Sequence, residues 1–171
     1  MEWREPRWQV LEGVSSKGGF PPKKSFPLIS ATEFAMNAEI ISVGTELLLG
    51  HTINTDAAFV ARELSAIGVN LLFACTVGDN PGRLRDALEE ALGRSDVVIT
   101  TGGLGPTDDD LTKETIASVA GAPLKIHEDS LRRLESYFKG RPAMGENQRK
   151  QAMLPEGCTV LDNDWGTAPG V

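Results

Sequence analysis

The chain has 171 residues, of which 17 are Lys or Arg and 24 are Asp or Glu, and its formal net charge is −7. This length suits one globular domain with a real hydrophobic core, and the acidic balance argues against a general nucleic-acid binder. No apolar run approaches the roughly 18 residues that a membrane span requires. Two cysteines do not make a disulfide framework, so we expect a cytoplasmic protein with no nucleic-acid or membrane partner.

The first 35 residues differ in pattern from the rest of the chain. They contain several prolines and show neither helical nor strand periodicity. We therefore predict a flexible N-terminal extension over residues 1–35 and a folded domain over residues 36–171.

The middle of the chain alternates strand and helix patterns. Short apolar runs at 38–43, 69–77 and 96–101 predict buried strands. Between them, Asn54 and Asn80 are typical N-caps of helices that end at Gly68 and Gly93. Strands that alternate with helices at this spacing predict an α/β fold with a mostly parallel sheet.

After residue 110 the pattern is weaker. It predicts helices over 111–120 and 128–138, a short helix over 146–153 and a strand over 158–161. The chain ends in a glycine-containing loop, residues 166–171. Because domains rarely end inside such a loop, we expect this one to be incomplete at its C-terminal end.

The unusual residues cluster where the predicted strands end. Ligands of open parallel sheets bind beyond the carboxyl ends of the strands, and glycines after the third strand let backbone amides approach an oxyanion. A tight strand-to-helix turn without a ligand explains these glycines equally well. The candidate phosphate- or nucleotide-binding residues are Gly44, Thr45, Glu46, Asn54, Thr101, Gly102, Gly103, Gly105, Pro106 and Thr107.

An acidic run directly follows this glycine loop. Asp108, Asp109 and Asp110 would repel a bare phosphate, whereas a divalent cation such as Mg²⁺ or Co²⁺ would bridge carboxylate and phosphate oxygens. An acid-rich helix start explains one or two of these residues without any metal. Asp79, at the end of the neighbouring strand, is the natural partner, so the predicted metal ligands are Asp79, Asp109 and Asp110.

Several of these segments together resemble a known family. IISVGTELLLG at 40–50, NT at 54–55, VGD at 77–79, TTGGLGPTDD at 100–109 and GTAPG at 166–170 are similar to the amino-terminal domain of the competence/damage-inducible CinA family. That domain belongs to the molybdopterin-binding MoaB/Mog-like superfamily, which has a three-layer α/β fold and often forms homo-oligomers. The resemblance covers residues 36–171.

The resemblance implies two activities. CinA domains of this kind are associated with metal-dependent hydrolysis of ADP-ribose to AMP and ribose 5-phosphate. In Mog-like relatives, carboxylates matching Asp79 and Asp110 serve adenylyl transfer to molybdopterin, which makes these two the candidate catalytic residues. Leu104 stands where Mog-like proteins typically carry Thr, which counts against the second activity.

A third possibility is a non-catalytic binding or assembly module. The carboxy-terminal amidohydrolase domain of full-length CinA proteins does not occur in this sequence, so we do not expect deamidation from it. The expected ligand is a nucleotide-type small molecule, with molybdopterin expected only under the transferase alternative.

Overall fold

The structure is a computed structural model that describes residues 36–171. The predicted extension over residues 1–35 lies outside this range and stays a prediction. Among the described residues, none of the helices has the length and apolar character that a membrane crossing would need.

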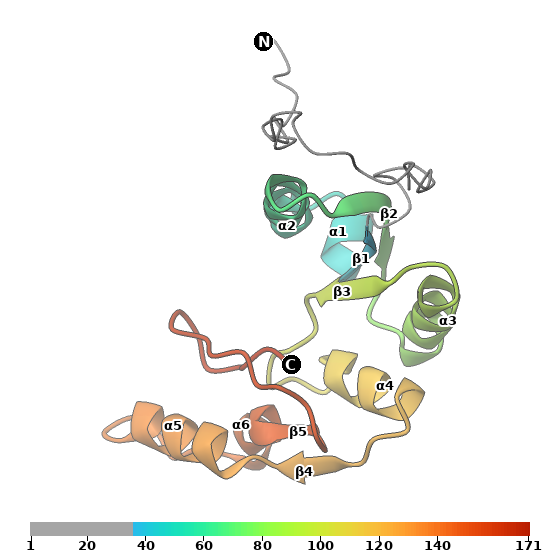
Figure 1. Ribbon diagram of the computed structural model, residues 1–171. Helices are drawn as coiled ribbons and strands as arrows, with labels where there is room; N and C mark the ends of the chain where they lie inside the picture. The colour runs from blue at the N-terminus through green and yellow to red at the C-terminus, as the bar shows by residue number, and fades with distance from the viewer. Residues whose placement is uncertain (1–35) are drawn as a thin grey trace, which may run out of the picture. The chain divides into compact units, whose positions relative to one another are not determined.

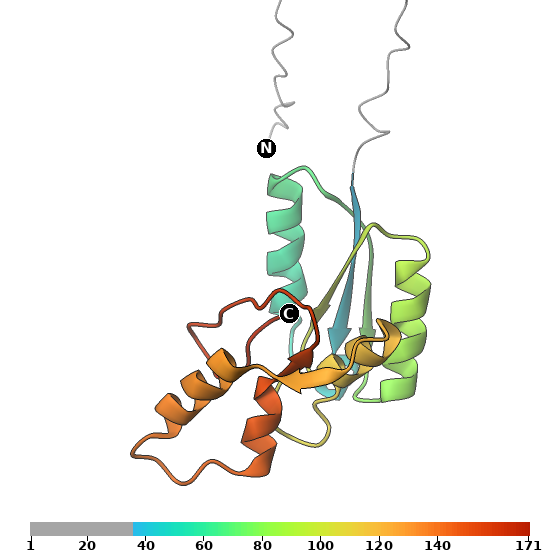
Figure 2. The same cartoon turned by 60° about the horizontal axis from the view of Figure 1, so that its bottom comes forward.

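A three-stranded parallel sheet forms the centre of the fold. Its strands are β1 (Asn37–Val43), β2 (Asn70–Val77) and β3 (Val97–Thr101), in the order β2-β1-β3. β1 pairs in parallel with both neighbours and is almost entirely buried. All three strands point toward the same end of the sheet (Figure 2), so their carboxyl ends share one edge.

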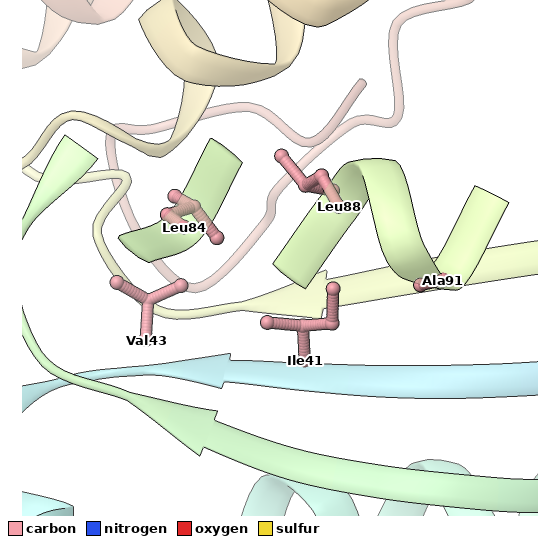
Figure 3. Close-up of a cluster of buried hydrophobic side chains, with 5 residues drawn as sticks. All are labelled: Ile41, Val43, Leu84, Leu88 and Ala91. Carbon is pink, nitrogen blue, oxygen red and sulfur yellow. The ribbon is translucent and has the colours of Figure 1, made fainter. Parts of the chain in front are cut away.

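Helices cover both faces of this sheet, which gives the predicted three layers. α2 (Thr55–Ala66) packs on one face against Ala38 and Ile40 through Leu64. α3 (Pro81–Leu92) covers the opposite face, where Leu84, Leu88 and Ala91 meet Ile41 and Val43 of β1 (Figure 3). Alternate residues of β1 therefore enter two different apolar clusters, which explains why apolar residues occur on both faces of this strand.

The two predicted caps are confirmed. The Asn54 side chain accepts a hydrogen bond from the Ala57 amide, and the Asn80 side chain accepts one from the Arg83 amide, both at 3.0 Å. Each bond satisfies one of the free N–H groups at the start of a helix. Pro81 follows Asn80 at the first helical position, where its fixed φ suits the helix.

One carboxylate is buried at the amino end of β1. Glu39 is 1% exposed, and its two oxygens accept hydrogen bonds of 2.7 and 2.9 Å from Arg94. The Arg94 guanidinium also lies 3.9 Å from the centre of the Phe73 ring. The hydrogen bonds from Arg94 hold the pKa of Glu39 below its ordinary value despite the opposing effect of burial.

After β3, α4 (Thr112–Val119) packs through Ile116 and Val119 against the cluster between α3 and β1. Residues 121–171 form a smaller lobe (Figure 1), with β4 (Leu124–Ile126), α5 (Glu128–Phe138), α6 (Glu146–Arg149), a 3₁₀ turn (Lys150–Ala152) and β5 (Met153–Pro155). β4 and β5 form a separate antiparallel pair. The lobe's own apolar cluster is small, with Leu131, Leu134 and Ala152 at its centre.

The structure corrects two sequence predictions, both in the lobe, and adds short elements that the sequence did not predict. The strand predicted over 158–161 is wrong, because this segment makes only an isolated bridge between Leu161 and Gly170. The strand lies earlier, where β5 finds a partner in β4, and it shortens the predicted helix 146–153 to α6 and the 3₁₀ turn. β4 and the four-residue helix α1 (Thr45–Leu48) had no periodic signal, because each is too short to show one.

Candidate functional site

Three loops meet at the carboxyl edge of the parallel sheet. They follow β1 at residues 44–54, β2 at residues 78–80 and β3 at residues 102–111. α1 and the loop after β3 lie at this edge (Figure 2). This is the place where open parallel sheets bind ligands, and nearly all the predicted site residues fall in these loops.

The glycine loop after β3 packs against the end of β1. Gly102 and Gly103 adopt positive φ angles of 87° and 63°. A Cβ atom on Gly102 would stand 2.1 Å from the Val43 carbonyl oxygen, and one on Gly103 would stand 2.2 Å from the Thr112 hydroxyl oxygen. The Thr112 hydroxyl donates a 2.9 Å hydrogen bond to the Gly102 carbonyl. Both positions therefore require glycine for conformation and for space.

Asp110 closes the same loop from within. One oxygen of its carboxylate accepts hydrogen bonds from the Thr107 amide at 2.8 Å and from the Thr107 hydroxyl at 2.6 Å. Burial opposes ionisation of this carboxyl group, but the hydrogen bonds from Thr107 and Gly105 and the positive charge of Lys150 hold its pKa below the ordinary value. Asp110 is thus an ionised group that shapes the glycine loop.

The loops after β1 and β2 are clamped together by a reciprocal pair of hydrogen bonds. The Thr45 amide donates to the Asp79 carboxylate at 2.9 Å, and the Asp79 amide donates to the Thr45 hydroxyl at 3.1 Å. Gly78 is buried beneath this contact, where an added Cβ atom would lie 3.1 Å from the Thr45 hydroxyl. The structure thus brings two of the predicted residues, Thr45 and Asp79, into direct contact.

Asn54 and Thr101 also meet, through a buried hydroxyl. The Asn54 amide group donates to the Ser42 hydroxyl at 2.8 Å, and the Thr101 hydroxyl lies 3.3 Å from the same oxygen. Asn54 caps α2 as well, so its contacts join the ends of β1, β3 and α2. Sequence reasoning did not single out Ser42 as part of this contact.

The other predicted residues are placed at the edge without such contacts. Glu46 is exposed, and its carboxylate folds back toward Gly44. A Cβ atom added to Gly44 would lie 2.4 Å from a Glu46 carboxylate oxygen. Pro106 is partly buried, and Asp108 and Asp109 are exposed. Glu46 and Asp109 are thus accessible to a ligand in solution.

The predicted metal ligands are not gathered into one group. Over residues 36–171, no three His, Cys, Asp or Glu side chains are arranged to hold a metal ion. The Asp79 carboxylate binds the Thr45 amide, while the Asp110 carboxylate binds Thr107. The assignment of Asp79, Asp109 and Asp110 as metal ligands therefore stays a prediction.

Sequence reasoning missed a lysine that contacts this loop from the second lobe. The Lys150 ammonium donates to the carbonyl oxygens of Asp110 at 2.7 Å and Thr107 at 3.2 Å. Lys150 lies 40 residues downstream of Asp110. No local pattern links the two positions, so only the folded chain reveals the contact.

Comparison with known proteins defines the class of protein. A family model described as "Probable molybdopterin binding domain" matches residues 39–171, a range that includes all three loops of the edge. A crystal structure of the protein CinA, of unknown function, from Thermoplasma acidophilum superimposes with a TM-score of 0.74. It shares 39% sequence identity, and the match covers 80% of each chain.

Two curated relatives agree with this result. A "CinA-like protein" of Desulfovibrio desulfuricans is 70% identical over 135 residues, which are 79% of this chain and 32% of that protein. A "CinA-like protein" of Dictyoglomus thermophilum is 53% identical over 137 residues, which are 80% of this chain and 33% of that protein. The chain belongs to the CinA family of molybdopterin-binding-type domains, and it spans about a third of the length of these curated relatives.

Proposed function

We propose that this domain binds a nucleotide diphosphate at the carboxyl edge of its sheet and hydrolyses ADP-ribose to AMP and ribose 5-phosphate. The observation that carries the proposal is the glycine loop after β3. Gly102 and Gly103 turn the backbone in left-handed conformations at the shared edge of three parallel strands, and each packs too closely on Val43 or Thr112 to carry a side chain. Such loops let backbone amides approach phosphate oxygens closely.

The acidic surroundings of the loop favour a diphosphate that arrives with a cation. Asp79, Asp109 and Asp110 lie in the loops of this edge, and their charges oppose the approach of a bare diphosphate. Mg²⁺ commonly uses one or two carboxylates together with substrate phosphates rather than a complete protein cage. The residues present fit that mode, with exposed Asp109 and the Asp79 and Asp110 carboxylates as the available donors. When bound, such a cation polarises the phosphoryl group and lowers the pKa of the attacking water.

The reaction itself needs only water as a second reactant. The water oxygen forms a bond to one phosphorus, and the bond from that phosphorus to the bridging oxygen breaks. The bridging oxygen leaves with the other phosphate, and the protons of the water are released to the products and solvent. In our proposal the loop amides hold the diphosphate, the Thr45–Asp79 clamp keeps the neighbouring loop in place, and Asp110 maintains the ionised, closed form of the glycine loop.

The test is AMP release from ADP-ribose by the purified chain, with and without Mg²⁺ or Co²⁺. We expect metal-dependent AMP release that falls about a hundredfold or more in Asp79→Asn and in Asp110→Asn. Asp86→Asn is the matched control, because Asp86 is an exposed residue of α3; it should stay within about twofold of wild type. Wild-type protein that releases no AMP under any of these conditions contradicts the proposal.

A second candidate is adenylyl transfer to molybdopterin, which the description of the matched family favours. It predicts binding of molybdopterin and no hydrolysis of ADP-ribose. Equilibrium binding of both ligands to the same preparation separates the two activities. ADP-ribose that binds without turnover would instead indicate a non-catalytic binding module.

We also propose that the protein is cytoplasmic and forms a homo-oligomer. Two free cysteines, Cys75 and Cys158, suit a reducing compartment. Sedimentation of the purified chain tests the oligomer, and a monomer at all concentrations would contradict it.

A further inference from the structure

Lys150 connects the second lobe to the glycine loop through its side-chain ammonium. The ammonium donates hydrogen bonds to the carbonyl oxygens of Asp110 at 2.7 Å and Thr107 at 3.2 Å. It also forms an ion pair with the Glu114 carboxylate of α4, at 3.3 Å. The Lys150 side chain is 21% exposed, so a competing water has limited access to these contacts.

A second lysine holds the turn that carries Lys150. Lys113 of α4 is 1% exposed, and its ammonium donates to the carbonyl oxygens of Gln151 at 2.9 Å and Lys150 at 3.3 Å. Burial lowers the pKa of Lys113. Lys113 of α4 therefore binds the backbone carbonyls of residues 150 and 151, while the Lys150 side chain binds the backbone carbonyls of Thr107 and Asp110.

Glu114 makes this arrangement specific for a cation at position 150. One of its oxygens pairs with Lys150, and the other, Oε2, is buried with no hydrogen-bond partner among residues 36–171. The Glu114 side chain as a whole is 27% exposed, but its buried oxygen lacks a compensating hydrogen bond. The positive charge of Lys150 therefore offsets part of the cost of placing the carboxylate here. The lysine thus serves the loop and α4 at once.

We propose that Lys150 is the positioning residue of the glycine loop, which it holds in its ligand-binding shape from the second lobe. Asp110 closes the loop from the inside through Thr107, and Lys150 fixes the carbonyl groups of these same two residues from the outside. Because a peptide plane is rigid, fixing these two carbonyls also fixes the direction of the Asp108 and Leu111 amides, so the C-terminal part of the loop is held in place. The identity of the ligand rests on the proposed function, whereas the positioning role of Lys150 rests on the contacts described above.

The first test measures the loop without any ligand. The Thr107 and Asp110 amides are hydrogen-bonded inside the loop, so their hydrogen exchange reports its closed form. In Lys150→Met we expect both to exchange about tenfold faster or more, with the amides of α3 within about twofold of wild type. Lys125→Met is the control, because Lys125 pairs with Glu156 on the exposed surface of the lobe. Unchanged exchange of Thr107 and Asp110 in a folded Lys150→Met would overturn the proposal.

The second test separates positioning from general stability. A displaced loop weakens binding in the ground state and the transition state alike, so the KM for ADP-ribose should rise about tenfold while kcat stays within about threefold. A lower kcat with unchanged KM overturns the proposal. If wild-type protein does not hydrolyse ADP-ribose, the proposed function fails, and the exchange measurement still decides the role of Lys150. Should Lys150→Met not fold, Lys150→Gln retains a hydrogen-bond donor and takes its place in both tests.

Discussion

The parallel-sheet half and the smaller lobe are each stabilised mainly by a different kind of interaction. β1 carries apolar side chains into clusters on both of its faces, whereas the lobe has one small apolar cluster and depends more on polar contacts such as those of Lys113 and Lys150. The glycine loop touches both regions. The comparison shows that the two ends of the loop are held differently. The end at Gly102 is fixed by close packing on β1, which leaves no room for an added atom. The end at Asp110 is fixed by hydrogen bonds from Lys150, whose strength a substitution can change.

The most severe way to break the packed side is Gly102→Ala. The new methyl group would overlap the Val43 carbonyl in a left-handed backbone conformation, so we expect a loss of about 4 kcal/mol or more in the free energy of unfolding. Gly121→Ala is the matched control, because Gly121 also has a positive φ but nothing lies within 4 Å of its added Cβ atom. It should cost only about 1 kcal/mol. Equal losses in urea denaturation would show that contact with β1 does not matter.

Paired leucine truncations compare the two regions directly. Leu88→Ala removes a buried side chain between α3 and β1 and should lower the global free energy of unfolding by about 3 kcal/mol. Leu134→Ala, in the lobe cluster, should instead speed hydrogen exchange in α5 while leaving the β1 amides nearly as protected as in wild type. The observation against this view would be the same loss of protection in β1 for both variants.

The smallest expected effect concerns the pH dependence of stability that the buried Glu39 carboxylate gives to the parallel-sheet half. The folded pKa of Glu39 lies below its ordinary value of 4.5, so in acid the unfolded chain takes up this proton before the folded one. Its contribution to stability is complete above about pH 4.5 and declines as the pH falls through the folded pKa. Glu39→Gln should therefore flatten the loss of stability below pH 4.5. Denaturation curves at pH 6 and in the acid range check this, and an unchanged slope would contradict it.

The sequence predicted the packed half well because its signals are local. The apolar run of β1 and the Asn54 and Asn80 caps each carry their own physical cause within a few residues. The lobe was harder to predict. β5 is a three-residue strand that exists because β4 lies opposite. Within residues 36–171, the β-branched segment near Val160 makes only an isolated bridge, between Leu161 and Gly170.

The same distinction holds for the site. The position of the glycine loop follows from chain order, and its requirement for Gly102 and Gly103 was visible as a pattern. The contacts of Thr45 with Asp79 and of Lys150 with Asp110 join residues 34 and 40 positions apart. Contacts at such separations are decided by the tertiary fold, so a single sequence does not reveal them.

The buried pair of Glu39 and Arg94 has a consequence for how such sequences can diverge. Glu39 is 1% exposed whereas Arg94 is 35% exposed. The two possible orders of substitution therefore differ in cost. If Arg94 changes first, a carboxylate is stranded inside the protein. If Glu39 changes first, the guanidinium can turn toward water and remain over Phe73. Substitution therefore has a preferred direction, and relatives caught between the two states should keep the arginine without the glutamate rather than the reverse.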